Sequence, residues 1–154
     1  MDLYQVLDDL KIEYKQVEHP PVFSAEESQK IKMKIQGVGG KNLFLTDKKG
    51  GYYLVILPDE KKANLKEIAK SIGTSHLTFA DEKELKEILG VTRGSVTPLG
   101  IINDIENKVL VLLDKDLQHQ TLLAHPNRNT ATISIKFEDL IRFIEYEKHK
   151  YFLI

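Results

Sequence analysis

The sequence of 154 residues contains no cysteine. This absence excludes disulfide scaffolds, thiolate zinc sites, iron–sulfur clusters and a cysteine nucleophile. No apolar stretch approaches the roughly 18 residues that a transmembrane helix needs. The start, residues 1–5, is acidic and lacks the basic and apolar regions of a secretory signal. We therefore expect a cytoplasmic protein with no membrane partner.

Proline, glycine and excess charge are also scarce. Five prolines and nine glycines are too few for a collagenous or low-complexity chain. The 22 basic and 23 acidic residues give a net charge of −1, whereas proteins that bind nucleic acid by bulk electrostatics are usually basic. Any nucleic-acid role must therefore rest on a local patch. An apolar fraction of 42% is enough for one core, and we expect a single domain over residues 1–154.

The spacing of apolar residues predicts an α/β fold. Capping boxes at Ser24–Glu27 and Asp81–Glu84 mark two helix starts, and Gly73 and Gly90 mark two helix ends. We expect helices over residues 3–10, 24–35, 65–72, 82–89 and 137–148, and strands over residues 12–18, 42–46, 52–57, 77–80, 101–102, 109–113, 131–135 and 151–154. No repeat or linker interrupts them, so we expect one mixed sheet flanked by helices.

Several common motifs are missing from the sequence. The glycine run at residues 37–40 precedes a strand and does not open a helix, so it fails the dinucleotide-binding context. There is no Walker A sequence and no Gly-x-Ser-x-Gly elbow. The five histidines show no His-x-x-x-His pair. We expect no metal and no cofactor.

The first of three unusual loops covers residues 28–46 and contains four lysines and no acidic residue. Lys30, Lys32 and Lys34 form either a solvated helix face or a positive patch for a polyanion. Lys41 differs, because it follows a glycine-rich loop and begins an apolar strand. This context holds its ammonium group at a defined place, beside glycine backbone that can approach a ligand closely.

The second loop, residues 90–100, combines glycines, a proline and small hydroxyls. It is either an ordinary tight connection or a rigid turn whose amides face a carbonyl or phosphate oxygen. The third, residues 125–132, is a dense polar run that leads into a core strand. Such a run is costly unless its side chains cap turns or contact a ligand.

These loops carry a family resemblance that extends from Val17 to the C-terminal helix. The sequence resembles the free-standing prolyl-tRNA editing proteins of the ProX/YbaK-like family. The matching stretches are Lys41-Asn42-Leu43-Phe44-Leu45, Leu89-Gly90-Val91, Gly94-Ser95-Val96-Thr97-Pro98, Asn103-Asp104, His125-Pro126-Asn127 and Asn129-Thr130-Ala131-Thr132.

The resemblance implies a curved, barrel-like mixed sheet with one deep pocket and hydrolysis of the aminoacyl ester of mischarged tRNA. The motifs at residues 94–98 and 125–132 look most similar to those of the branch that deacylates Ala-tRNA(Pro). The resemblance implies that an oriented water attacks the ester with help from the substrate's own ribose hydroxyl. A synthetase pocket rejects a smaller amino acid by only about 1–3 kcal/mol, so a second, smaller site completes a double sieve. The implied partners are tRNA(Pro) and, for delivery, prolyl-tRNA synthetase; we expect a monomer.

The resemblance also implies residue roles. Lys41 anchors the aminoacyl-adenosine end, and amides of the loop Gly94, Ser95, Val96, Thr97 and Pro98 hold the carbonyl or the water. His125 shapes the pocket and bonds the ligand, supported by Asn127 and Thr130. Lys30, Lys32 and Lys34 contact the acceptor stem.

The sequence departs from residues common in the family at Arg93, Leu99 and Ala124. The identity of the amino acid removed from the tRNA is therefore less certain than the reaction. The alternatives are a deacylase for cysteine, serine or 2-aminobutyrate, or a non-catalytic module that binds aminoacyl-tRNA or an amino acid. A plain protein-interaction domain leaves the polar run at residues 125–132 unexplained.

Overall fold

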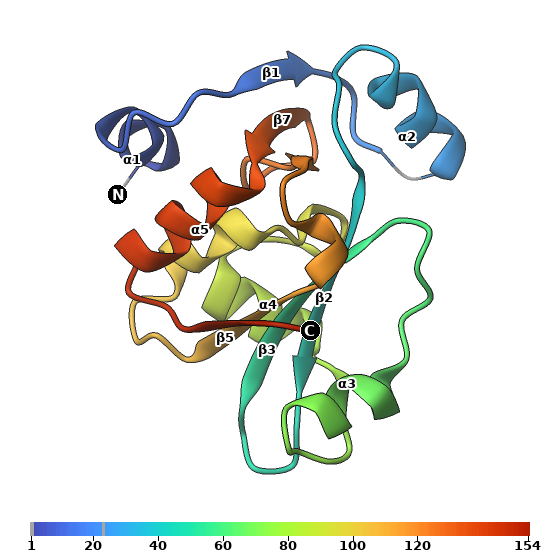
Figure 1. Cartoon of the computed structure of the whole chain (residues 1–154), viewed down its shortest axis with the longest axis vertical. Coiled ribbons are helices and arrows are strands. Elements are labelled where there is room, and N and C mark those ends of the chain that lie inside the picture. Colours follow the sequence, from blue (N-terminus) through green and yellow to red (C-terminus); the bar gives the residue numbers. More distant parts are fainter. Residues whose placement is uncertain (1, 23) are drawn as a thin grey trace.

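The computed structural model describes residues 2–22 and 24–154 (Figure 1). Its helices are α1 (Leu3–Asp9), α2 (Ala25–Lys32), α3 (Leu65–Ser71), α4 (Glu82–Leu89) and α5 (Phe137–Tyr146), with 3₁₀ helices η1 (Arg93–Ser95), η2 (Pro98–Asn103) and η3 (Lys115–Leu117). Its strands are β1 (Lys15–Glu18), β2 (Gly40–Thr46), β3 (Tyr52–Pro58), β4 (Thr78–Phe79), β5 (Val109–Leu113), β6 (Thr121–Ala124), β7 (Ala131–Lys136) and β8 (Tyr151–Leu153). Among these helices none is long and apolar enough to cross a membrane.

The strands form two sheets where the sequence predicted one. The larger sheet has the order β4-β2-β3-β5-β8, with antiparallel pairing around β2 and parallel pairing of β3 with β5 and of β5 with β8. The smaller sheet, β1-β7-β6, is antiparallel throughout. A single bridge between Val38 and Leu122 links the segment before β2 to the smaller sheet. The predicted α/β class is confirmed.

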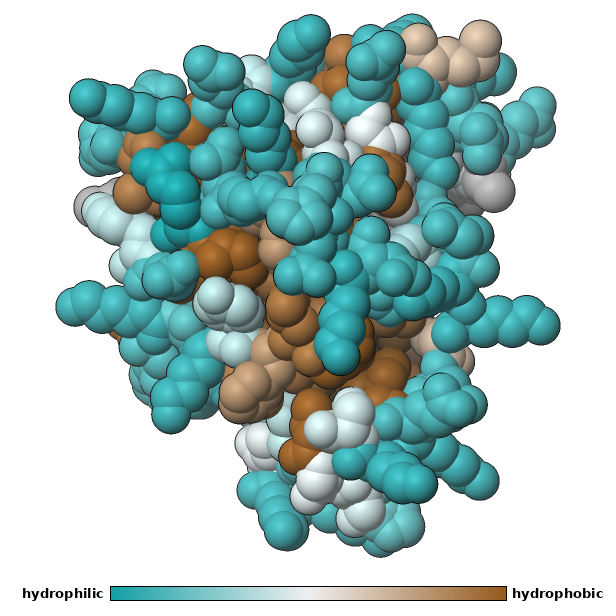
Figure 2. Space-filling model, viewed as in Figure 1, coloured by the Kyte–Doolittle hydropathy of each residue, from teal (hydrophilic) through white to brown (hydrophobic). Residues whose placement is uncertain are grey.

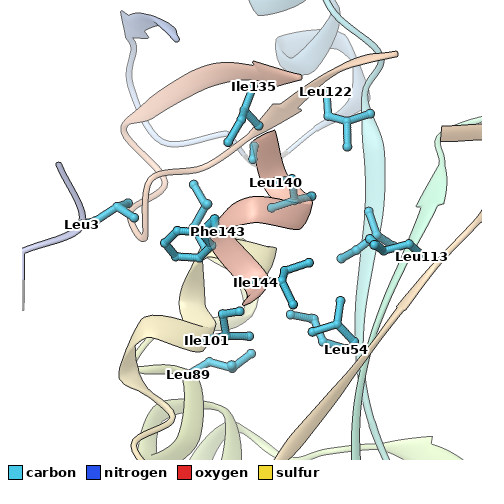
Figure 3. Close-up of a cluster of buried hydrophobic side chains, with 14 of the residues drawn as sticks. Leu3, Leu54, Leu89, Ile101, Leu113, Leu122, Ile135, Leu140, Phe143 and Ile144 are labelled. Carbon is cyan, nitrogen blue, oxygen red and sulfur yellow. The ribbon is translucent and has the colours of Figure 1, made fainter. Parts of the chain in front are cut away.

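Helix α5 lies between the two sheets and supplies the centre of the main core (Figure 3). Phe143, Leu140 and Ile144 are fully buried there. Strand β7 points Ile133 and Ile135 into the same core, because alternate side chains of a strand lie on opposite faces. Its intervening residues, Thr132 and Ser134, therefore lie on the other face of the small sheet, where two depressions are found.

A second apolar cluster lies on the opposite face of the larger sheet. Leu45, Val55 and Leu112 are fully buried there, and Ile68 of α3 packs against this cluster. Figure 2 shows hydrophobic residues at the surface in the lower half of the view, in the region of α3 and the C-terminal end. This cluster gives β2 an apolar environment on both faces, which fixes the direction of each side chain along the strand.

Most predicted helix ends are confirmed. The Ser24 hydroxyl accepts from the Glu27 amide, Asp81 and Glu84 form a reciprocal capping box, and Gly90 ends α4 with φ 68°. The strand expected at residues 101–102 was wrong: Pro98 starts a 3₁₀ helix there, and the Thr97 hydroxyl caps it by accepting from the Leu99 amide. Strand β6, only four residues long, was not predicted.

Candidate functional site

A polar depression of about 100 Å³ lies on the outer face of the small sheet, beside α2. Segments from four parts of the chain meet around it: the loop after β1 together with α2, the start of β2, the residue after β3, and the region of β6 and β7. We call it the polar depression; its lining residues are Val22, Ser28, Ile31, Lys32, Gly39, Gly40, Asn42, Asp59, Leu123, Ala124, His125 and Thr132.

His125 presents a hydrogen-bond acceptor to this depression. Its Nδ1 lies 2.9 Å from the carbonyl oxygen of Ala131, which can only accept, so Nδ1 carries the proton and Nε2 is left as the acceptor. Burial lowers the pKa of His125 below its ordinary value of 6.5; the hydrogen bond to Ala131 opposes this shift, and the neighbouring His19 adds to it. The ring is therefore neutral at pH 7.

Thr132 lines the depression beside His125, and His19 lies against both of these residues. The His19 and His125 rings lie 6.1 Å apart in an edge-on arrangement. His19 Nδ1 donates to the carbonyl of Pro20, and His19 Nε2 accepts from the Thr132 hydroxyl, both at 2.9 Å. Thr132 is buried, and its hydroxyl is held by this bond.

Asn42 faces the depression from β2 with an unpaired acceptor. It sits opposite Ile56 in the β2–β3 pair and on the same face as Phe44, which is buried in the main core. Its Oδ1 is buried and has no hydrogen-bond partner among the residues that the structure describes. An unsatisfied buried acceptor costs about 1–3 kcal/mol, so a ligand that donates to it would recover that energy.

The polar run at residues 125–132 ties the surrounding loops together. Asn127, in the left-handed conformation with φ 63°, donates from Nδ2 to the carbonyl of Leu99 at 3.4 Å. Asn129 donates from Nδ2 to the carbonyl of Val22 at 3.0 Å. A Cβ on Gly94 would lie 3.1 Å from this same Nδ2, so Gly94 lies directly against Asn129. The second and third loops, separate in sequence, are therefore neighbours.

Within the second loop, only Pro98 approaches the depression. It lines a small apolar void of about 10 Å³ beneath the depression, together with Gly40, Asn42 and Ala124. Ser95 and Thr97 are buried, and Val96 is half-buried against the main core. None of the residues from Gly94 to Thr97 lines the polar depression. This loop thus supports the depression from behind.

Thr130 and Arg128 hold the third loop against β1. The Thr130 hydroxyl accepts from Arg128 at 2.8 Å, and its carbonyl accepts from the His19 amide at 2.9 Å. Arg128 also makes two hydrogen bonds of 2.8 Å to the carboxylate of Glu18. This interaction lowers the pKa of Glu18 to about 2. Thr130 therefore positions the loop and does not face the depression.

The structure does not bring Lys41 together with His125. Lys41 pairs with Leu57, so its side chain leaves β2 on the α3 side, away from Asn42. Its Nζ donates to the carbonyl of Lys61. The predicted lysine patch is also divided: Lys32 pairs with Asp59 at the rim of the depression, Lys30 is exposed on α2, and Lys34 lies in a different groove.

Asn42, His19 and Thr132 were not among the predicted site residues. Strand alternation was the available signal for Asn42, because it shares a face with Phe44 while Lys41 points the opposite way. No such local signal marks His19, which reaches Thr132 only through the pairing of β1 with β7. Within the described part of the chain, no three His, Asp or Glu side chains are grouped to hold a metal ion.

The profile of the aminoacyl-tRNA editing domain matches residues 19–143, which include this whole constellation. The chain belongs to the aminoacyl-tRNA editing domain family. The resemblance to the ProX/YbaK-like family is thereby confirmed. The match begins at His19 and extends into α5, so it includes strands β2 to β7, whereas β1 precedes it and β8 follows it.

Curated relatives agree with this assignment, and a solved structure has the same fold. The prolyl-tRNA editing protein ProX of Acetoanaerobium sticklandii is 41% identical over 141 residues, which is 90% of this chain and 86% of that protein. The prolyl-tRNA synthetase associated domain-containing protein 1 of Danio rerio is 38% identical over 151 residues, covering 96% and 82%. The crystal structure of hypothetical protein APE2540 superposes with a TM-score of 0.76 at 16% identity, covering 98% and 97%, and so shares the fold.

Proposed function

We propose that this editing-domain protein is a free-standing hydrolase that removes alanine from mischarged Ala-tRNA(Pro), and that the polar depression is its active site. The proposal rests on one observation: His125 and Asn42 line the same cavity of about 100 Å³, and His125 Nε2 and Asn42 Oδ1 are acceptors without a hydrogen-bond partner among the described residues. The names of the relatives point to prolyl-tRNA as the substrate class.

The size and lining of the depression favour a small amino acid. Ile31, Leu123 and Ala124 form an apolar wall that suits a methyl group. A Cβ on Gly39 would lie 2.7 Å from Cε of Lys32, so this part of the rim is closely packed beneath the Lys32–Asp59 pair. A synthetase discriminates poorly against an amino acid that lacks methylenes, whereas a small second site excludes the larger, correct amino acid by size. Alanine fits this logic, and proline is the residue to be excluded.

The reaction is hydrolysis of the ester between the amino acid and the terminal ribose. Water attacks the carbonyl carbon, the bond from this carbon to the ribose oxygen breaks, and the ribose oxygen leaves with a proton. His125 Nε2 accepts a hydrogen bond from the attacking water or from the neighbouring ribose hydroxyl, which assists the attack. Asn42 Oδ1 accepts from the amino group of the substrate. Positioning in a water-poor site contributes most of such a rate increase.

The other predicted residues act as positioning residues in this proposal. Thr97 and Pro98 support Asn42 and Ala124 from below, and Asn127 and Thr130 hold the loop that carries His125. Lys41 bonds the carbonyl of Lys61 and thereby ties β2 to residues 59–64, the segment that places Asp59 at the rim. Replacing Lys41 with alanine therefore reduces activity through the shape of the rim.

The test is deacylation by the purified protein of tRNA(Pro) charged with alanine, cysteine, serine, 2-aminobutyrate or proline. We expect rapid loss of alanine and no loss of proline. If cysteine, serine or 2-aminobutyrate is removed faster than alanine, that amino acid is the substrate in place of alanine, and the reaction is still ester hydrolysis. Tight binding of alanyl-tRNA without hydrolysis would contradict the proposal and identify a non-catalytic binding module.

A further inference from the structure

A second groove lies on the same face of the small sheet as the polar depression. Its volume is about 720 Å³, and it is formed by the segment before β1, the linker between α2 and β2, and the ends of β6 and β7. We call it the lysine groove, after the three lysines that line it: Lys15, Lys34 and Lys136.

Strand register shows how the groove and the depression are related. Along β7, Thr132 lines the depression, whereas Ser134 and Lys136 line the groove. These residues alternate with the core residues Ile133 and Ile135, so they share one face. Lys15 sits opposite Ser134 in the β1–β7 pair and extends the groove across the sheet. The groove therefore continues from the depression along a single surface.

The groove carries a net positive charge. Lys15, Lys34 and Lys136 are all exposed, and none is in an ion pair within residues 2–22 and 24–154. Glu13 is the carboxylate that lines the groove. His119 also lines it, and its Nδ1 lies 3.0 Å from Glu138. Three free ammonium groups around an open groove suit the phosphates of a nucleic acid.

We infer that the lysine groove binds the phosphate backbone of the tRNA behind its aminoacylated end. This inference rests on the proposed function, because the polar depression fixes where that end lies. Thr132 and Lys136 are four residues apart, about 13 Å along a strand. Stacked nucleotides advance about 3.4 Å each, so the groove meets the backbone roughly four nucleotides from the ester. That position is where the single-stranded end of a tRNA joins its acceptor stem.

The test combines Lys15→Gln, Lys34→Gln and Lys136→Gln in one variant and measures its affinity for uncharged tRNA(Pro) across a series of KCl concentrations. Each phosphate contact contributes about 0.7–0.9 to the salt slope. We expect the slope to flatten by roughly 2 to 3 and binding at 0.1 M salt to weaken about 100-fold. An affinity and slope equal to those of the wild type would overturn the inference.

A matched control removes the same charge elsewhere. Lys48, Lys66 and Lys70 are exposed and line a third depression beside α3, away from the small sheet. Their replacement by glutamine leaves tRNA affinity within about twofold of the wild type if the lysine groove is the binding surface. A larger loss in this control than in the groove variant would place the tRNA on the α3 side and contradict the inference.

A short substrate separates this inference from the proposed function. The 3′ alanyl ester of adenosine carries no phosphate and does not extend to the groove lysines, so the groove variant hydrolyses it as the wild type does. Equal impairment on the short ester and on full-length alanyl-tRNA would show that the lysines act through the active site, which overturns the groove. If the wild type hydrolyses neither substrate while the groove variant alone loses tRNA affinity, the proposed function fails and the groove stands.

Discussion

The polar depression and the lysine groove lie on one face of the same three-stranded sheet, yet they differ in size and in charge. The depression is small; it is lined by the neutral residues His125 and Asn42 and by the paired charges of Lys32 and Asp59. The groove is several times larger and lined by exposed lysines that are unpaired within the described part of the chain. Successive side chains on one face of β7, Thr132 and then Ser134 and Lys136, thus lead to two different environments.

This difference predicts that the depression determines the rate of hydrolysis, whereas the groove determines the affinity for tRNA. Hydrogen-bonding groups in a partly desolvated site act strongly on the reacting atoms, because little water screens them. Exposed lysines act on a polyanion through counterion release, which depends on salt and not on the reaction. Variants in the depression should therefore change turnover, and variants in the groove should change binding. The following predictions test that separation, from the largest expected effect to the smallest.

Asn42→Leu should change activity and stability in opposite directions. Leucine keeps the approximate size of the side chain but removes the buried acceptor that has no partner among the described residues. We expect the turnover rate to fall roughly 100-fold, as for the loss of one positioned polar group in an active site. The free energy of unfolding should rise by about 1–3 kcal/mol, because the unsatisfied group is gone. Single-turnover kinetics and urea denaturation measure the two changes, and a loss of stability would show that Asn42 is a structural residue.

Ala124→Val should narrow the depression while leaving the groove intact. Ala124 lines the depression and the small void beneath it and lies opposite Ile133 on the core face, so two added methyl groups fill the base of the depression from below. We expect hydrolysis of alanyl-tRNA to fall at least about tenfold, the effect of a methylene-sized change in a pocket. Affinity for uncharged tRNA should not change. Normal hydrolysis by a folded Ala124→Val protein would place the amino acid elsewhere.

The His125 ring should titrate below pH 6.5. Burial lowers its pKa, so the folded protein resists a proton that the unfolded chain accepts at about pH 6.5. The free energy of unfolding contributed by His125 is therefore constant above pH 6.5 and declines as the pH falls below it. NMR of the ring protons, assigned with His125→Asn, gives the midpoint. A midpoint at or above 6.5 would mean that the ring is not desolvated.

Arg128→Ala should produce the smallest effect. Without the two hydrogen bonds from Arg128, the pKa of Glu18 should rise from about 2 toward its ordinary value of 4.5. The pair is exposed, so its contribution to stability is small. Carboxyl-carbon NMR follows Glu18, while turnover reports on the third loop. An unchanged Glu18 pKa would show that the pair is not formed in solution.

The sequence allowed much of the scaffold to be predicted, because its signals there are local. Capping residues and left-handed glycines define α4, and alternation with a glycine turn defines the β2–β3 hairpin. The division into two sheets was not predictable in the same way. It depends on the pairing of β7 with both β1 and β6, and these contacts are distant along the chain.

The proposed site overlaps the predicted residues in part. The family resemblance pointed to His125 and to the loops at residues 94–98 and 125–132; His125 lines the polar depression, whereas of residues 94–98 only Pro98 lies beneath it. It also pointed to Asn103-Asp104, whose role is structural: Asp104 accepts from His149 and from the Val109 amide, each at 2.9 Å, and Asn103 donates to the carbonyl of Leu89. The direction of Lys41 and the grouping of Lys34 with Lys15 and Lys136 depend on strand register, which no motif specifies.

The central claim is that the chemistry occurs at the polar depression, and His125→Ala tests it most directly. Its matched control is His119→Ala, because the His119 side chain is 88% exposed and lies in the groove. In single-turnover hydrolysis of alanyl-tRNA(Pro) at saturating enzyme, we expect His125→Ala to lower the rate roughly 100-fold. His119→Ala should not lower it, and His125→Ala should bind uncharged tRNA as the wild type does. An unchanged hydrolysis rate in folded His125→Ala would contradict the account.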